Sequence, residues 1–209
     1  LIKANGEMTY FMSDVAYHYN KMERGFDHLI NIWGADHHGY IARCEAMLAA
    51  WGWPGALEIM LGQLVNLFRD GEAVRMSKRT GEMITFEELI DEVGVDATRY
   101  LMLAKSSDQP IDFDIEVAKK KDASNPVYYV QYAHARSKNV DRNAAAAGIS
   151  YEGADLALLD TEADGEVLAA LAQFPSVLAT AADDRQPHKV ARYLEELAAT
   201  YHKWYNVER

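Results

Sequence analysis

Residues 28–40 read HLINIWGADHHGY, and this stretch decides the class of fold. Residues 28–33 form a short, mostly apolar run, which is typical of a buried β-strand. Gly34 interrupts the run, and a helix is expected from about Tyr40 to Trp51. A buried strand that leads through a glycine turn into a helix predicts an α/β layered sheet.

The segments on either side continue this alternation of strands and helices. Ser13 can cap a helix, and Asp70-Gly71 predicts a hairpin turn. Thr85 and Glu88 have the spacing of a capping box, which predicts another helix start. The expected elements are helices over residues 14–24, 86–92 and 96–105 and strands within residues 58–68 and 72–75.

Strand signals stop after residue 122. Asn125 and Pro126 have the residue types that favour a helix cap and the first helical position. Pro175 and Pro187 are expected to mark two later helix starts. The chain is therefore predicted to divide into an α/β domain over residues 1–122 and an all-α bundle over residues 123–209. The expected helices cover residues 126–145, 162–173, 175–183 and 187–206, with a loop over residues 147–161.

The composition excludes several classes of protein. Of the 209 residues, 49% are apolar and 25% are charged, so the chain is neither disordered nor of low complexity. Cys44 is the one cysteine, which excludes an internal disulfide and a zinc site built on cysteine pairs, and it favours a cytoplasmic location. No apolar run reaches the roughly 18 residues that span a bilayer, so no membrane association is expected.

The charge balance is acidic, with 21 Lys and Arg against 32 Asp and Glu and a formal net charge of −11. As a total, this disfavours nucleic-acid binding, because such surfaces are usually basic. The charge is uneven, since residues 151–166 hold six acids and no base, whereas residues 126–142 hold three bases and one acid. Binding depends on the local potential, so the total charge limits an RNA-binding surface without excluding it.

Cationic side chains lie close together in residues 75–79, RMSKR, between the expected hairpin and the capped helix. A loop that carries Arg75, Ser77 and Lys78 can bring an ammonium group to a polyphosphate. It can also neutralise the charge that develops in phosphoryl or nucleotidyl transfer. A solvated basic loop is the alternative interpretation.

Polar residues follow the predicted buried strand at its carboxyl end, where α/β sheets bind ligands. Gly34 would let the backbone approach a ligand, and Asp36 could accept hydrogen bonds from ribose hydroxyls. His37 and His38 could contact a phosphate or a polar substrate. A polar turn is the alternative. A metal site is disfavoured, because adjacent histidines point in different directions and no third ligand has suitable spacing.

Tyr10 and Asp14 are four residues apart, so they share one face of a helix. A carboxylate below an aromatic hydroxyl suits a cationic ligand. A guanidinium fits best, because it can pair with a carboxylate through two hydrogen bonds. In the alternative interpretation, Asp14 only stabilises the helix N-terminus.

Aromatic side chains gather in residues 125–136, NPVYYVQYAHAR. Three tyrosines and a histidine within seven residues could stack on nucleic-acid bases. Tyr129 and Arg136 from this segment and Trp204 from the last helix are the candidate RNA contacts. Packing of the aromatic rings within the protein is the alternative.

Together, these segments resemble class I aminoacyl-tRNA synthetases and, within that class, the arginyl-tRNA synthetases. Residues 75–79 resemble the second signature loop of the class, Lys-Met-Ser-Lys-Ser, and residues 34–36 resemble its Gly-x-Asp segment. The arginyl assignment rests on residues 9–14, 33–40 and 125–136.

The resemblance implies a fold and a set of roles. Residues 1–122 would be the C-terminal half of a Rossmann-like catalytic domain, and residues 123–209 a helical anticodon-binding domain. The roles implied are arginine binding for Tyr10, Asp14 and His38; ATP binding for Gly34, Asp36, His37, Met76 and Lys78; and the chemical step for Lys78, Ser77 and Arg75.

The sequence departs from the family pattern in three respects. The first class I signature, His-x-Gly-His, is absent from these residues, and Arg75 replaces the first lysine of the second signature loop. The helical bundle is also expected to stop one helix early. The chain is therefore expected to be part of a longer protein and to be inactive alone.

The function that the resemblance implies is ATP-dependent activation of L-arginine to arginyl-adenylate and transfer of arginine to tRNA(Arg). L-arginine, tRNA(Arg), ATP and the Mg²⁺ that accompanies ATP are the expected partners and cofactors. No protein-bound metal is expected, and the parent protein is expected to be a monomer. A tRNA-binding module without catalysis is the alternative. A cysteinyl-type enzyme is disfavoured, because it needs a cysteine-rich zinc site.

Overall fold

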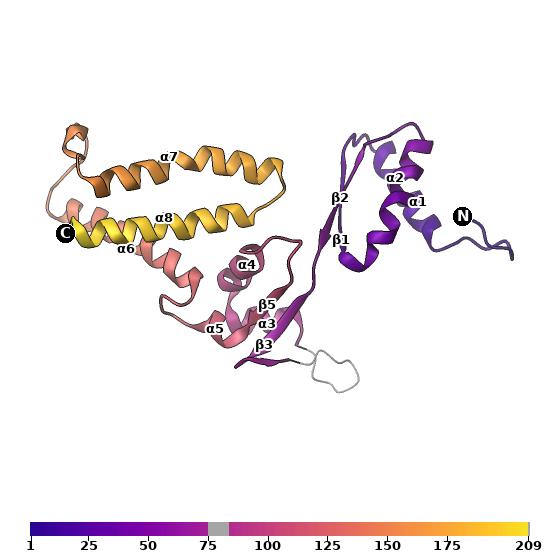
Figure 1. The fold of residues 1–209 in the computed structure, drawn as a ribbon, viewed down its shortest axis with the longest axis horizontal. Helices are drawn as coiled ribbons and strands as arrows, with labels where there is room; N and C mark the ends of the chain where they lie inside the picture. The colour runs from indigo at the N-terminus through magenta and orange to yellow at the C-terminus, as the bar shows by residue number, and fades with distance from the viewer. Residues whose placement is uncertain (75–83, 209) are drawn as a thin grey trace. The chain divides into compact units, whose positions relative to one another are not determined.

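A computed structural model describes residues 1–74 and 84–208, and the chain forms two compact units (Figure 1). The first unit contains Leu1–Leu64 and Ser107–Pro110, and the second contains Val65–Ser106 and Ile111–Arg209. Each unit has its own small sheet.

The first unit is built around two parallel strands, β1 (Leu29–Gly34) and β2 (Leu57–Gly62). Burial alternates along β1, so the predicted buried strand is confirmed with one face covered. The register ends with Gly34 opposite Gly62, which leaves two glycines at the carboxyl edge of the sheet. The other elements of the unit are α1 (Phe11–Glu23), the 3₁₀ helix η1 (Ala35–Tyr40) and α2 (Ile41–Ala50).

Helix α1 starts three residues before the predicted position. Tyr10 occupies the cap with helical backbone angles, and no side chain caps the helix there. The amide of Met12 donates to the carbonyl of Thr9, and the amide of Ser13 donates to that of Tyr10, so a backbone turn already begins the helix. The predicted cap at Ser13 is therefore wrong, and Ser13 lies inside the first turn.

The second unit begins with a three-stranded sheet in the order β4-β3-β5, formed by Glu72–Ala73, Val65–Arg69 and Ile111–Asp114. The predicted hairpin is confirmed, because Asp70 and Gly71 connect β3 to β4 with φ angles of 52° and 78°. Both angles have the sign that this two-residue turn requires. The parallel pairing of β5 with β3 was not predicted from the sequence.

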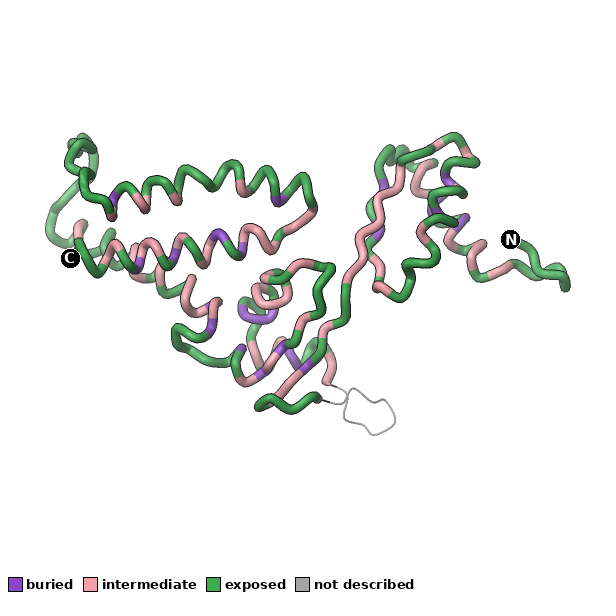
Figure 2. Tube along the Cα trace, viewed as in Figure 1, coloured by how far each residue is buried: buried purple, intermediate pink, exposed green. Residues whose placement is uncertain are grey.

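Helices α4 (Val95–Leu103) and α5 (Ile115–Lys119) pack against this sheet, and α3 (Phe86–Val93) packs against both of these helices. The capping box between Thr85 and Glu88 is confirmed in both directions. The core of this part is a cluster of buried residues, and Figure 2 colours buried residues purple along the trace. Its members are Leu67, Leu89, Phe113, Ile115 and Ala118.

The rest of the second unit is helical. It consists of α6 (Pro126–Ala146), η2 (Leu156–Leu158), α7 (Glu162–Asp183) and α8 (His188–Val207). The predicted start at Asn125-Pro126 is confirmed, because Oδ1 of Asn125 accepts a hydrogen bond from the amide of Val127. Among residues 126–208, which the structure describes, no strand occurs, as predicted.

Pro175 does not begin a helix, which corrects the prediction of separate helices over residues 162–173 and 175–183. It lies inside the continuous helix α7. Proline there removes one backbone hydrogen bond, but packing along α8 keeps the two halves of α7 in one helix. The ring of Phe174 lies 5.4 Å from that of Tyr193, whose hydroxyl donates to the carbonyl of Ala170 at 3.1 Å.

Helix α7 is also long and apolar enough, by length and composition, to cross a membrane, with a mean hydropathy of 1.3. No uninterrupted apolar run of that length occurs in the sequence, because α7 carries acidic residues near both ends. In the structure, α7 packs against α8 (Figure 1).

Candidate functional site

A small cavity of about 190 Å³ lies in the first unit at the carboxyl end of β1. This volume is several times the roughly 30 Å³ that one water molecule occupies, so a small side chain fits. The residues that line the cavity come from three consecutive elements of the chain. They are Tyr10 and Asp14 from the start of α1, Trp33 from β1, and His37 and Tyr40 from η1.

Local structure explains this arrangement. Tyr10 and Asp14 are one helical turn apart at the beginning of α1, so they face the same direction, as predicted. Gly34 ends β1 in an extended conformation and serves as the cap of η1. The 3₁₀ turn then brings His37 between two aromatic rings, at 6.4 Å from Trp33 and 6.3 Å from Tyr40.

The cavity suits a cation. The carboxylate of Asp14 makes no hydrogen bond or ion pair with any residue that the structure describes, and its side chain is half-buried. Burial raises the pKa of the Cys44 thiol on α2, and the negative charge of Asp14 acts in the same direction. An unpaired carboxylate among aromatic rings attracts a guanidinium through charge and through the ring faces.

The structure brings His37, rather than His38, to the cavity. The sequence predicts ATP binding for His37 and arginine binding for His38. Of these two residues, only His37 is among the residues that line the cavity. His38 lies in the same 3₁₀ helix with an exposed side chain. The sequence also missed Trp33 and Tyr40 as lining residues. The sequence did contain one signal for Tyr40: it lies three residues after His37, and residues with this spacing share a face of a 3₁₀ helix.

Gly34 and Asp36 lie beside this cavity at the edge of the sheet. A Cβ atom at Gly34 would lie 2.6 Å from Oδ1 of Asp36, a distance that real Cβ contacts do not show. The missing side chain therefore lets the Asp36 carboxylate fold back over the strand end. Asp36 is exposed, and its Oδ2 lies 3.8 Å from Nε2 of His37.

The predicted basic loop cannot be placed in this site. Arg75, Met76, Ser77 and Lys78 lie outside the described residues, as does Arg79. The strand before them, β4, belongs to the second unit, whereas Gly34 and Asp36 belong to the first.

The three candidate RNA contacts occur together on α6 and α8. The guanidinium of Arg136 lies between the rings of Tyr132 and Tyr205, at 4.8 Å and 4.4 Å from their centres. Tyr129 packs its ring 4.8 Å from His202. Trp204 donates a 2.7 Å hydrogen bond from Nε1 to Oδ1 of Asp164. Each residue therefore has a packing partner within the chain, and each is half-buried.

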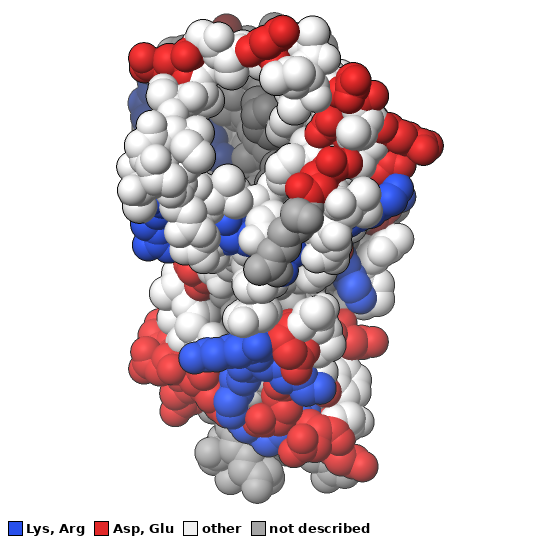
Figure 3. Space-filling model, turned by 90° about the vertical axis from the view of Figure 1, so that its left-hand side faces the viewer, with Lys and Arg blue, Asp and Glu red and all other residues white. Residues whose placement is uncertain are grey.

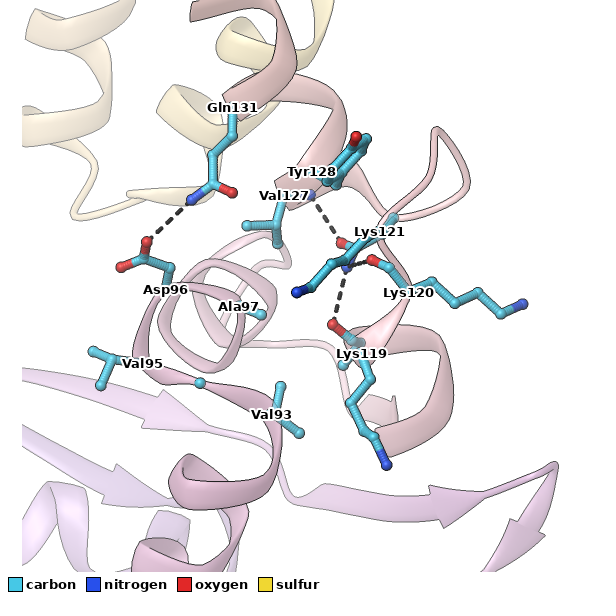
Figure 4. A pocket seen from close by; sticks show the side chains of 13 residues that line it. Val93, Val95, Asp96, Ala97, Lys119, Lys120, Lys121, Val127, Tyr128 and Gln131 are labelled. Atoms are coloured by element: carbon cyan, nitrogen blue, oxygen red, sulfur yellow. Dashed lines mark hydrogen bonds between the residues drawn. The ribbon is translucent and has the colours of Figure 1, made fainter. Parts of the chain in front are cut away.

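A larger pocket of about 560 Å³ lies in the second unit between α4, α5 and α6 (Figure 4). Lys119, Lys120 and Lys121 contribute to its lining, against one acidic residue, Asp96. Asp96 accepts a 3.0 Å hydrogen bond from Gln131, which Figure 4 marks. The lining therefore carries a net positive charge.

Charged side chains of both signs occur over the face drawn in Figure 3. The acidic residues gather in small groups beside the basic ones, in agreement with the uneven charge of the sequence. Among the described residues, no three His, Cys, Asp or Glu side chains come together in a way that could hold a metal ion.

The sequence is similar to curated arginine–tRNA ligases along its whole length. It is 66% identical to the arginine–tRNA ligase of Bifidobacterium longum over 214 residues, which cover 100% of this chain and 34% of that protein. It is 52% identical to the arginine–tRNA ligase of Listeria monocytogenes, over 99% of this chain and 37% of that protein. The chain thus spans about a third of the length of these relatives.

A family model and two solved structures agree with this similarity. Residues 130–209 match the DALR anticodon binding domain. A crystal structure assigned to an arginyl-tRNA synthetase of Campylobacter jejuni aligns with a TM-score of 0.86 and 40% identity, over 100% of this chain and 46% of that one.

The arginyl-tRNA synthetase of Thermus thermophilus has a TM-score of 0.76 at 23% identity, over 99% of this chain and 42% of that one, and it supports the fold alone. The predicted resemblance to arginyl-tRNA synthetases is therefore confirmed, together with an α/β region followed by a helical one.

Proposed function

Because this chain shares its sequence and its fold with part of the arginine–tRNA ligases, we propose that it serves the ATP-dependent attachment of L-arginine to tRNA(Arg). The observation that carries the proposal is the unpaired carboxylate of Asp14 in the cavity beside Tyr10 and His37. A substrate guanidinium is the complementary group, since its planar donors match a carboxylate in a bidentate pair.

ATP is proposed to bind at the adjoining edge of β1. Gly34 leaves room for the Asp36 carboxylate at the strand end, and we propose that Asp36 accepts hydrogen bonds from the ribose, with His37 next to it. Met76 and Lys78 are proposed to complete the ATP site. The ATP would be bound as its Mg²⁺ complex, with the metal held by the phosphates.

In the proposed reaction, the carboxylate of arginine attacks the α-phosphate of ATP. The bond to the β-phosphate breaks, arginyl-adenylate forms and pyrophosphate leaves. Lys78, with Ser77 and Arg75, would stabilise the negative charge on the leaving pyrophosphate. A hydroxyl of the tRNA then attacks the carbonyl carbon of arginyl-adenylate, the ester of arginine forms and AMP leaves. His38 is proposed to assist arginine binding from η1.

The helical bundle is proposed to bind the anticodon region of tRNA(Arg), on the basis of the domain match over residues 130–209. Tyr129, Arg136 and Trp204 are proposed to form part of this contact through their exposed edges. The catalytic and anticodon-binding parts are proposed to divide between residues 122 and 123. A cytoplasmic monomer is the proposed state of the whole protein.

The test is arginine-dependent exchange of pyrophosphate into ATP by the complete gene product, with tRNA present. Asp14→Asn should raise the KM for arginine roughly tenfold or more, because one charge-assisted pair is lost. The matched control, Asp27→Asn, removes an exposed carboxylate outside the cavity and should leave that KM unchanged. Lys78→Ala should lower the exchange rate roughly tenfold or more. Exchange that does not depend on arginine contradicts the proposal.

A tRNA-binding module without catalysis is the second candidate for the isolated 209 residues. The sequence contains the region matched to an anticodon-binding domain but no His-x-Gly-His signature. The isolated chain should then retard tRNA(Arg) in a binding assay and show no exchange activity. Exchange activity in this isolated chain would contradict this candidate.

A further inference from the structure

Three hydrogen bonds connect Lys21, Asn31 and His18 to the backbone of Asp14, whose side chain lines the proposed arginine cavity. Nζ of Lys21 donates to Oδ1 of Asn31 at 3.2 Å, and Nδ2 of Asn31 lies 2.7 Å from Nε2 of His18. Nδ1 of His18 lies 2.7 Å from the backbone carbonyl of Asp14. The chain therefore leads from a cation on α1 through β1 to the residue that carries the carboxylate in the cavity.

The direction of these hydrogen bonds is fixed from both ends, because the ammonium of Lys21 can only donate and the backbone carbonyl of Asp14 can only accept. An ammonium group can only donate, so the amide oxygen of Asn31 must face Lys21 and its NH₂ group must face His18. Nε2 of His18 must then accept, which leaves the proton of the neutral imidazole on Nδ1. That proton is donated to the carbonyl of Asp14.

The two central side chains of this hydrogen-bonded series are shielded from water. His18 is 3% exposed and Asn31 is 8% exposed. Burying polar groups costs free energy unless each of them is paired, and here Asn31 pairs Lys21 with His18, which in turn pairs with the carbonyl of Asp14. Two apolar side chains would fill the same space between α1 and β1 without that dependence. The arrangement therefore specifies a position more narrowly than packing alone.

The hydrogen bonds join α1 to β1, and both of these elements contribute residues to the cavity. Asp14, His18 and Lys21 follow one face of α1 at spacings of four and three residues. Asn31 and Trp33 are two residues apart on β1, so they lie on the same face of the strand. A shift of α1 along β1 would separate Asp14 from Trp33 and His37.

We propose that Lys21, Asn31 and His18 are positioning residues that hold the Asp14 carboxylate at the distance a guanidinium requires, with His18 in the neutral Nδ1–H form. This inference rests on the proposed function for its substrate. It assigns specificity for the cationic substrate to residues that do not touch it. It therefore predicts an effect on arginine binding that is separate from ATP binding.

The decisive variant is Asn31→Leu in the complete gene product, with Asn20→Leu as its matched control on the exposed side of α1. Asn31→Leu removes the bonds to both Lys21 and His18 and should raise the KM for arginine roughly 5- to 30-fold. The KM for ATP should change by less than about twofold, since the ATP site lies beyond the strand end. Asn20→Leu should change neither value.

A spectroscopic measurement tests the mechanism without activity. Nitrogen NMR of histidine-labelled protein should show the Nδ1–H tautomer for His18, with His18→Gln used to assign the signal. Lys21→Met should leave the Nδ1–H tautomer in place, because the carbonyl of Asp14 can only accept, and it should raise the KM for arginine, because Asn31 loses its partner. Lys21→Arg, which keeps a donor-only group, should leave both the tautomer and the KM for arginine unchanged.

An Nε2–H tautomer in the wild-type protein would overturn the proposal. An unchanged KM for arginine in a folded Asn31→Leu variant would also overturn it. Absence of arginine dependence in the wild type would instead overturn the proposed function, and the tautomer measurement would still decide whether the directed chain exists.

Discussion

Arg69 and Glu92 meet through two hydrogen bonds, from Nη1 to Oε1 at 2.7 Å and from Nη2 to Oε2 at 2.8 Å. Arg69 also donates to Glu116 at 2.8 Å, and Lys119 bonds both glutamates. Two cations and two carboxylates thus alternate in one network. The network joins β3, which leads into the hairpin, to α3 and α5.

This network should make the stability of the second unit depend on acid pH. The hydrogen bonds from Arg69 and Lys119 lower the pKa of Glu92 to about 2 from its usual 4.5. A lowered pKa stabilises the folded state above pH 4.5, and this contribution is lost as the pH falls towards 2.

Glu92→Gln should therefore reduce the urea midpoint at pH 7 and reduce its fall between pH 4.5 and pH 2. Asp91→Asn, on the same helix, is the control. Equal pH profiles for the wild type and Glu92→Gln would show that the network does not contribute.

Asn125 is expected to be one of the most sensitive positions for stability. It is 3% exposed, caps α6 and donates from Nδ2 to the carbonyls of Ala118 and Lys120 at 2.9 Å and 2.8 Å. Asn125→Ala removes the cap and leaves polar groups unpaired, so a loss of about 2–4 kcal/mol is expected in urea unfolding.

The aspartate variant separates these contributions. Asn125→Asp keeps the acceptor for the amide of Val127 but removes the two donated bonds. Its second carboxylate oxygen would then face the two carbonyl acceptors in a buried position, so at pH 7 it should lose at least as much stability as Asn125→Ala. If Asn125→Ala lost only about 0.5 kcal/mol, as an ordinary exposed cap does, this account would be contradicted.

Pro175 should be a position where substitution stabilises the protein. It is exposed and lies inside α7, where proline removes a backbone donor. Pro175→Ala should raise the free energy of unfolding by about 1–3 kcal/mol, because alanine is a much better residue in a helix interior. Circular dichroism during urea unfolding measures the change, and a lower midpoint would show that packing on α8 requires the proline.

A side chain at Gly34 should change the position of the Asp36 carboxylate, whose Oδ1 occupies the place that a Cβ atom would take. Gly34→Ala should displace Asp36 and raise the KM for ATP of the complete gene product roughly tenfold, the cost of about one charge-assisted hydrogen bond. Gly39→Ala adds the same methyl group where no heavy atom lies within 4 Å, and it should leave the KM for ATP unchanged. Equal effects of the two substitutions would argue against a role for Asp36 in ATP binding.

The cavity could be predicted only in part from the sequence. Tyr10 and Asp14 were paired correctly, because helical spacing alone places them on one face. Which of the adjacent histidines lines the cavity depends on the rotation of η1 relative to β1, and Trp33 and Tyr40 enter through the same geometry. No pattern within a few residues encodes that rotation.

The local signals of the sequence determined the turns and the helix starts. The hairpin at Asp70-Gly71, the capping box at Thr85 and the cap at Asn125 all depend on backbone angles or hydrogen bonds between residues at most three positions apart. Their energies are available before any tertiary structure forms, so residue types alone predict them.

Only the tertiary structure decided the features that need distant partners. The short strand β5 pairs with β3, about 46 positions earlier in the chain. Helix α7 continues through Pro175 while packed on α8, and His18 is oriented by Asn31, 13 positions later. Their free energy comes from burial and pairing between separate elements, which no local pattern contains.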